Sequence, residues 1–188
     1  MTLTCQLRGT VPPPLDEPIL TAGWRCGIDL HPIDLTDSDD MAWLRALVWA
    51  DHPDRACRLD QATQAAMSGQ LPPIHAGDVF QLLPDVLATT PPEAVACVFH
   101  TATLAHFSSE ARERFEHLVA ELSGDRPICW LQAEPRPGTE PRLRLTWCEY
   151  GHREHTWALG HYHPHGAWIE WIALNRTLAD GKCTIGRT

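Results

Sequence analysis

Apolar residues gather in four short runs along the first two thirds of the chain. The runs cover residues 25–30, 73–76, 94–100 and 128–133. The last two are almost continuously apolar, a pattern typical of strands buried on both faces of a parallel sheet. We therefore predict four strands, the first of which reaches its end at Asp29.

Helical patterns separate these runs. A helix is predicted to start within residues 36–40, where hydroxyl and carboxylate side chains precede apolar residues at helical spacing. Further helices are predicted over residues 54–67, after the turn at Gly77 and Asp78, and from Ser108 onward. Strands that alternate with helices indicate right-handed crossovers and a mostly parallel sheet.

The last third of the chain has a different pattern. Leucine and tryptophan alternate with polar residues over positions 143–147, and a turn follows at Tyr150 and Gly151. Residues 155–159 and 167–173 continue this alternation. The pattern predicts an antiparallel meander at the edge of the sheet.

These elements predict a Rossmann-like α/β fold with a mostly parallel sheet and an antiparallel C-terminal edge meander. We expect a single domain over residues 1–174. Its residues 1–23 hold four prolines and are predicted to form an extended arm. Residues 175–188 show no pattern and are expected to be a loose tail.

Composition narrows the function classes. The formal net charge is −9, and no cluster of lysine and arginine offers a footprint for phosphates, which disfavours nucleic-acid binding. Seven cysteines without a C-x-x-C pair indicate reduced thiols in a cytoplasmic protein. The N-terminus lacks a signal segment, and no apolar run is long enough for a membrane helix.

Three polar residues at predicted strand ends are candidate cofactor ligands. Asp29, Asp78 and His100 each end or follow a predicted strand, and ligands of open parallel sheets bind beyond the carboxyl ends of the strands. This layout is that of Rossmann-like methyltransferases, whose cofactor is S-adenosylmethionine. The alternative is that Asp29 and Asp78 are turn or cap residues, a role that aspartate favours. The glycine-rich turn of such folds is missing from residues 1–188.

Four segments carry a resemblance to a known family: residues 26–34, 43–49, 98–102 and 163–168. On them the chain resembles the bacterial family named domain of unknown function 2332 over most of residues 3–174. The resemblance implies a likeness to class I methyltransferases and an upstream glycine-containing segment, after which this sequence is expected to begin. The sequence departs from the family at His31, where asparagine is expected.

The C-terminal histidines are candidate metal ligands. His161, His163 and His165 would face one side of an extended strand, and His152 and His155 lie one hairpin arm away. The alternative is a set of exposed histidines at a sheet edge that bind nothing. The resemblance implies that His165 belongs to a structural turn.

Nucleophile motifs are lacking. Ser108 and Ser109 are explained as helix-start residues, because no G-x-S-x-G elbow surrounds them. Cys97 and Cys129 lie inside apolar runs and are predicted to be buried and inert.

Three functions follow as hypotheses. The first is a methyltransferase-like domain without cofactor binding of its own, which is either inactive or completed by another chain. The possible partners are a second copy in a homodimer and a separate N-terminal chain. The second is a working S-adenosylmethionine-dependent methyltransferase. The third is a metal-binding or interaction module that uses the C-terminal histidines and tryptophans.

Overall fold

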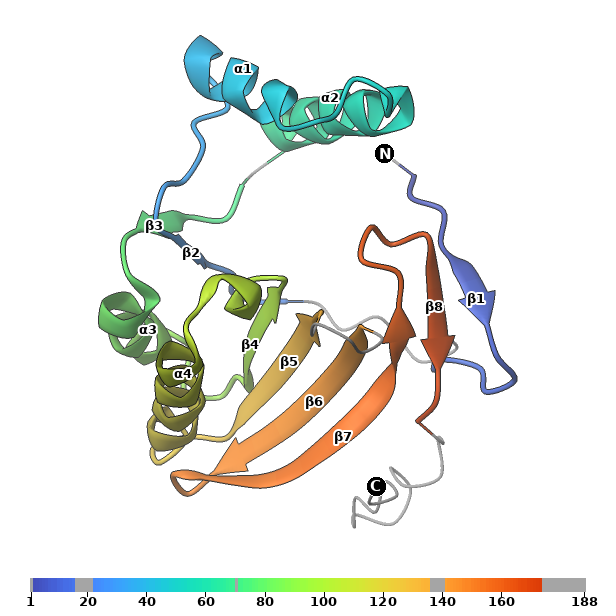
Figure 1. Ribbon diagram of the computed structural model, residues 1–188. Coiled ribbons are helices and arrows are strands. Elements are labelled where there is room, and N and C mark those ends of the chain that lie inside the picture. The colour runs from blue at the N-terminus through green and yellow to red at the C-terminus, as the bar shows by residue number, and fades with distance from the viewer. Residues whose placement is uncertain (1, 16–21, 70, 136–140, 174–188) are drawn as a thin grey trace. The chain divides into compact units, whose positions relative to one another are not determined.

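The computed structural model describes residues 2–15, 22–69, 71–135 and 141–173 (Figure 1). Backbone contacts divide the chain into two compact units. The first comprises residues 1–3 and 22–89, and the second comprises residues 4–21 and 90–188. The region predicted as one domain, residues 1–174, therefore comprises two compact units. The predicted tail lies outside the described residues.

The first unit contains three helices and a small parallel sheet. The elements are β2 (Gly27–Asp29), α1 (Ser38–Ala46), α2 (Pro53–Ser68), β3 (Ile74–Ala76) and α3 (Val79–Ala88). Helix α1 begins after Asp37 and α3 after Asp78, and both aspartates accept hydrogen bonds from the amides of the first turn. Each of these elements lies close to its predicted position.

Strand β2 pairs with β3 in a two-stranded sheet of its own. The prediction that residues 25–30 belong to the same sheet as residues 94–100 and 128–133 is therefore wrong. Each of the two strands has only three residues, and every residue of β3 is exposed. A strand inside a large parallel sheet needs an apolar face to bury, and these strands do not supply one.

The second unit is built on a six-stranded sheet in the order β1-β8-β7-β6-β5-β4. The strands are β1 (Gln6–Arg8), β4 (Ala96–Thr101), β5 (Ile128–Glu134), β6 (Arg142–Glu149), β7 (His152–Tyr162) and β8 (Trp168–Trp171). A short 3-10 helix, η1 (Leu104–His106), and helix α4 (Ser109–Leu122) connect β4 to β5.

This sheet is mixed, so the prediction of a mostly parallel sheet is wrong. The pairs β4–β5 and β1–β8 are parallel, whereas β5–β6, β6–β7 and β7–β8 are antiparallel. The physical reason is that β4 and β5 are joined through η1 and α4, whereas the segments between the strands after β5 are too short for the crossover that parallel pairing needs. The parallel pairing of β4 with β5 and the antiparallel pairing of the last strands are confirmed.

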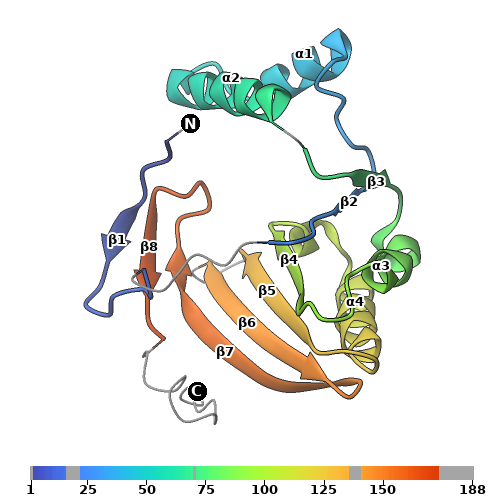
Figure 2. The ribbon, with the colours of Figure 1, turned by 180° about the vertical axis from the view of Figure 1, so that it is seen from behind.

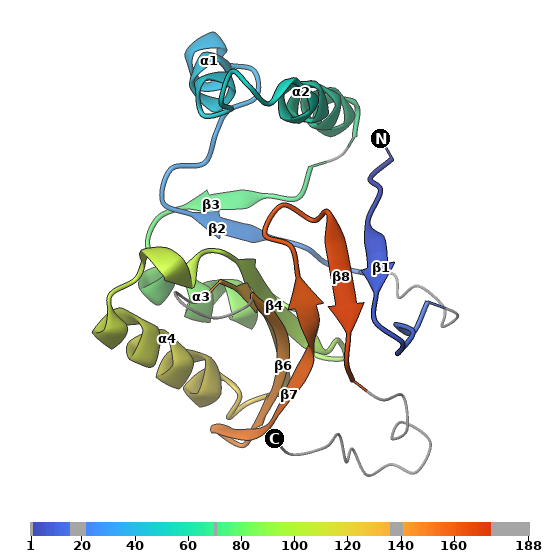
Figure 3. The ribbon, with the colours of Figure 1, turned by 45° about the vertical axis from the view of Figure 1, so that its right-hand side comes forward.

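The predicted arm contributes the edge strand β1, which lies alongside β8 in Figures 1 and 3. Gln6 pairs with Trp168, and the guanidinium carbon of Arg8 lies 4.5 Å from the centroid of the Trp168 ring. A cation over an indole face attaches the arm to the sheet in addition to the backbone pairing. The homodimer stays a prediction.

Helix α4 covers one face of this sheet (Figure 3). The Phe115 ring of α4 lies 5.9 Å from the Trp130 ring of β5, and Ile128 and Val119 are fully buried. The other face, seen from behind in Figure 2, carries a second apolar cluster around Trp157 and Leu159.

Strand β4 is not buried on both faces, which corrects the sequence prediction. Its residues alternate in exposure because α4 packs on one face only, where His100 contacts Phe115, and Phe99 on the other face is 72% exposed. Among the described residues, no helix is long and apolar enough to cross a membrane.

Candidate functional site

A cavity of about 180 Å³ lies in the second unit, at the carboxyl ends of β4 and β5. Its lining is mostly charged and polar and consists of Leu104, Arg112, Glu116, Gln132, Glu134, Pro135, Arg142 and Arg144. Crevices at the carboxyl ends of parallel strands are the usual ligand sites of such sheets. We therefore take this cavity as the candidate functional site.

Strand register brings the polar side chains to one face. Glu134 is the last residue of β5, and Gln132 lies two positions earlier on the same face. In the antiparallel pair with β6, Glu134 lies opposite Arg142, and Gln132 lies opposite Arg144. Directly opposed residues share a face, so two arginines of β6 lie on the same face as Glu134, at the C-terminal end of β5.

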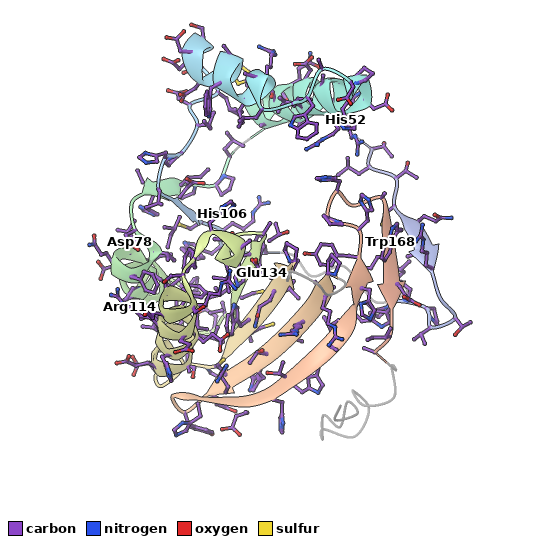
Figure 4. The ribbon with its side chains drawn as sticks, viewed as in Figure 1. His52, Asp78, His106, Arg114, Glu134 and Trp168 are labelled. Carbon is purple, nitrogen blue, oxygen red and sulfur yellow. The ribbon has the colours of Figure 1, made fainter. Side chains whose placement is uncertain are left out.

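One oxygen of Glu134 is held by the turn after β4. Ala102, the residue after β4, has a φ of 53°, a left-handed conformation that turns the chain sharply. The backbone amides of Thr103 and Leu104 then donate to Glu134 Oε1 over 2.9 and 3.2 Å. Figure 4 shows Glu134 at the end of β5.

The same oxygen also meets His100. His100 Nδ1 lies 2.6 Å from Glu134 Oε1, and the Trp130 indole N–H donates to His100 Nε2 over 3.0 Å. Because an indole nitrogen can only donate, Nε2 is an acceptor and the network assigns the ring proton to Nδ1. The imidazole is 8% exposed, so its role is to orient Glu134 from inside the fold.

The second oxygen of Glu134 has no partner among the described residues. Oε2 is buried and accepts no hydrogen bond, although Oε1 accepts three. A buried carboxylate oxygen without a donor costs free energy, about 1–3 kcal/mol or more for a charged group. This oxygen can accept a hydrogen bond from a donor group of a ligand.

The remaining charges of the cavity differ in how firmly they are held. The Arg112 Nε donates to the Leu104 carbonyl over 2.7 Å, and Glu116 pairs with Arg153 at 2.6 Å. Burial raises the pKa of Tyr162 on β7, and the negative charge of Glu134 raises it further. The Tyr162 hydroxyl therefore lies within the electrostatic field of the same carboxylate.

The predicted cofactor ligands divide between the two units. Asp29 and Asp78 lie at the carboxyl ends of the paired strands β2 and β3, where the Gly77 amide donates to the Asp29 carbonyl over 2.8 Å. Their side chains accept hydrogen bonds from the amides of His31 and Phe80, which are the contacts of the cap interpretation. His100 belongs to the second unit. Their role in cofactor binding stays a prediction.

The C-terminal histidines lie at and after the end of β7. His161 is in the strand, whereas His163 and His165 form the turn before Trp168, with ring centroids 5.7 Å apart. The His165 amide donates to His163 Nδ1 over 3.1 Å, which occupies one possible ligand atom. Within the described ranges, no group of three His, Cys, Asp or Glu side chains is placed to hold a metal ion.

Sequence reasoning missed Glu134 and the arginines of the cavity. The signal was present, because Arg142 and Arg144 alternate with Leu143 and Leu145 and must face away from the leucines. The pairing of β6 with β5 was needed to bring them to Glu134.

Comparison with known proteins gives one match. Residues 1–171 match the family model described as "Uncharacterized protein conserved in bacteria (DUF2332)". No curated protein and no solved structure matches the chain significantly.

Proposed function

Since the chain belongs to the uncharacterised bacterial family DUF2332, we propose its function from the geometry of the cavity. The second unit binds a small molecule that carries an anionic group beside a hydrogen-bond donor. The single observation that carries this proposal is the unpartnered, buried Oε2 of Glu134 in a cavity lined by arginines.

The size of the cavity favours a compact ligand. Its volume of about 180 Å³ is smaller than the roughly 300 Å³ at which pockets for drug-sized ligands begin. A molecule with the bulk of an amino acid suits this space better than a nucleotide cofactor does.

The charges favour a zwitterion. Arg142 of β6 can hold a carboxylate, since the guanidinium fork matches two carboxylate oxygens. An ammonium group can donate to Oε2 of Glu134, because the three hydrogen bonds that Oε1 accepts hold the carboxylate in place. A free amino acid carries both groups at a short separation, and it is therefore the ligand class that we propose.

The test uses free L-amino acids as probes. Each is added to the full chain, and binding is measured by changes in the amide NMR spectrum and by titration calorimetry. Acetate and methylammonium, each of which carries only one of the two groups, serve as controls. We expect at least one amino acid to bind more tightly than either control.

The Glu134→Gln variant tests whether the charge of Glu134 is needed for binding while the local fold is kept. The amide oxygen of glutamine still accepts from Thr103 and Leu104, so the turn after β4 is retained, but the negative charge is lost. We expect binding to weaken at least about tenfold, the effect of losing a charged hydrogen bond of roughly 1.5–3 kcal/mol. Glu121→Gln, on an exposed position of α4, is the matched control. Unchanged binding in Glu134→Gln, or no binding of any probe, would refute the proposal.

A second candidate is the methyltransferase-like interpretation, which concerns the first unit. The observation that favours it is the parallel pair β2–β3, which brings Asp29 and Asp78 to neighbouring carboxyl ends. We expect S-adenosylmethionine to bind weakly or not at all, because two carboxylates cannot replace a glycine-rich amide turn.

Calorimetry on the full chain tests this expectation. Micromolar affinity that falls in both Asp29→Asn and Asp78→Asn would support the S-adenosylmethionine-dependent alternative instead. Asparagine retains the local turn and cap hydrogen bonds at both positions, so a loss of binding would report on the charge.

A further inference from the structure

Two cysteines face each other across the parallel strands β4 and β5. Cys97 and Cys129 are register partners, as are their neighbours Val98 and Trp130. Neighbouring strands lie about 4.8 Å apart, which is within the roughly 4.4–6.8 Å between the Cα atoms of disulfide partners. Side chains alternate along a strand, so both thiols lie on the face opposite to Trp130 and the cavity.

The two thiols differ in exposure. Cys97 is exposed on the edge strand, whereas Cys129 is half-buried on the next strand inward. The sequence prediction that Cys97 is buried is wrong, because it assumed a strand covered on both faces. A reagent can therefore reach Cys97 first.

The two thiols also differ in acidity. A hydrogen bond from the Cys129 thiol lowers the pKa of Cys97 to about 7, and the same bond together with burial raises the pKa of Cys129. At neutral pH a larger share of Cys97 than of an ordinary cysteine is then present as the thiolate. A nucleophilic thiolate beside a protonated thiol is the arrangement of an attacking and a resolving cysteine.

We propose that Cys97 and Cys129 form a redox site that a peroxide converts reversibly into a disulfide. The Cys97 thiolate attacks one oxygen of hydrogen peroxide and breaks the O–O bond, giving a sulfenic acid and hydroxide. The Cys129 sulfur then attacks the sulfenic sulfur, and its proton leaves with the hydroxyl group as water. Two electrons pass from the thiols to the peroxide, and a thiol reductant returns them.

The experiment maps the oxidation products of the full, reduced chain. The protein is treated with one equivalent of hydrogen peroxide, remaining thiols are alkylated under denaturing conditions, and tryptic peptides are identified by mass spectrometry without reduction. Arg112 and Arg114 lie between the two cysteines, so trypsin places them in separate peptides. We expect a disulfide-linked peptide pair joining Cys97 to Cys129, which dithiothreitol separates.

Alkylation rates provide the matched comparison. At pH 7 we expect Cys97 to react with iodoacetamide about tenfold faster than Cys57, an exposed cysteine on α2. Cys129→Ala, which removes the hydrogen-bond donor, is expected to remove most of that difference and to leave peroxide-treated Cys97 as sulfenic or sulfinic acid. Cys57→Ser is expected to leave the disulfide unchanged.

One further measurement uses the unsubstituted chain, so its result does not depend on whether the variants fold. Phenylarsine oxide bridges two nearby thiols, and we expect one equivalent to protect Cys97 and Cys129 together from alkylation. Overoxidation of Cys97 with Cys129 still reduced, a disulfide to another cysteine instead, or equal alkylation rates for Cys97 and Cys57 would overturn the proposal.

Discussion

The two compact units differ in how much apolar surface they bury. Among the described residues of the first unit, the buried apolar side chains are Met41 and Leu83, and α2 has none. The second unit contains all the others, including Trp130, Ile128 and Val119. A helix buries its apolar side against another element, and a sheet face can cover that side only along the length of its strands. The strands of the first unit have three residues each and therefore cover little apolar helix surface.

Both candidate sites lie on the unit with the larger core. Strands β4 and β5 carry Glu134 and its partners on one face and the cysteine pair on the other. A site that must hold a carboxylate or a thiol pair in one geometry needs rigid supports, and paired strands under a packed helix supply them. Four predictions test whether this difference in burial produces a difference in stability between the units. The free energy of unfolding is measured by urea denaturation unless another method is stated.

The largest expected effect comes from the core tryptophan of the second unit. Trp130 is 1% exposed and donates to His100, so Trp130→Ala should lower the free energy of unfolding by about 3–5 kcal/mol. Trp49 in the first unit is 71% exposed, and Trp49→Ala should change the free energy of unfolding by less than about 0.5 kcal/mol. Equal effects of the two substitutions would contradict the comparison.

A smaller effect is expected where two backbones approach closely. A Cβ added to Gly160 on β7 would lie 2.3 Å from the Glu170 carbonyl oxygen of β8. Gly160→Ala must separate the strands, and we expect a loss of about 1–3 kcal/mol, as for other overpacked sites. Gly23 has no atom within 4 Å of the corresponding position, so Gly23→Ala is the control and should not destabilise.

Helix caps should show whether stability is shared between the units. Asp37 accepts from the amides of Asp39 and Asp40 at the start of α1, and Ser108 accepts from Ala111 at the start of α4. Alanine at either position should cost about 1 kcal/mol. Measured by hydrogen exchange, Asp37→Ala should speed exchange in α1 while β5 and β6 stay protected. A general loss of protection would show that the units unfold together.

Much of the fold could be predicted from the sequence because local signals suffice for helices and for strand existence. The caps at Asp78 and Ser108 set helix starts that the structure confirms. Strand neighbours could not be predicted in the same way, because pairing depends on contacts between distant residues. The strand over residues 25–30 was therefore assigned to the wrong sheet, and residues 94–100 were expected to be buried on both faces although β4 is an edge strand.

The candidate site was harder to predict than the fold. His100 was singled out as a strand-end residue, but its partner Glu134 lies 34 positions later and forms a hydrogen bond to it only because β4 and β5 are neighbours. The arginines of β6 required the antiparallel register as well. The cysteine pair likewise depends on register, since Cys97 and Cys129 are far apart in the sequence.

The smallest expected effects come from the ion pairs on the surface of each unit. Arg45 and Asp60 in the first unit are 58% and 52% exposed, and solvent screens their attraction, so Asp60→Asn should cost at most about 0.5 kcal/mol. In the second unit, Arg153 pairs with Glu116, whose side chain is 30% exposed and lines the cavity, and Glu116→Gln should cost about 0.5–1 kcal/mol. Because the Debye length falls to about 3 Å in 1 M salt, sodium chloride should remove the effect of Asp60→Asn first. A larger or more salt-resistant effect for Asp60→Asn would show that burial does not set the strength of these pairs.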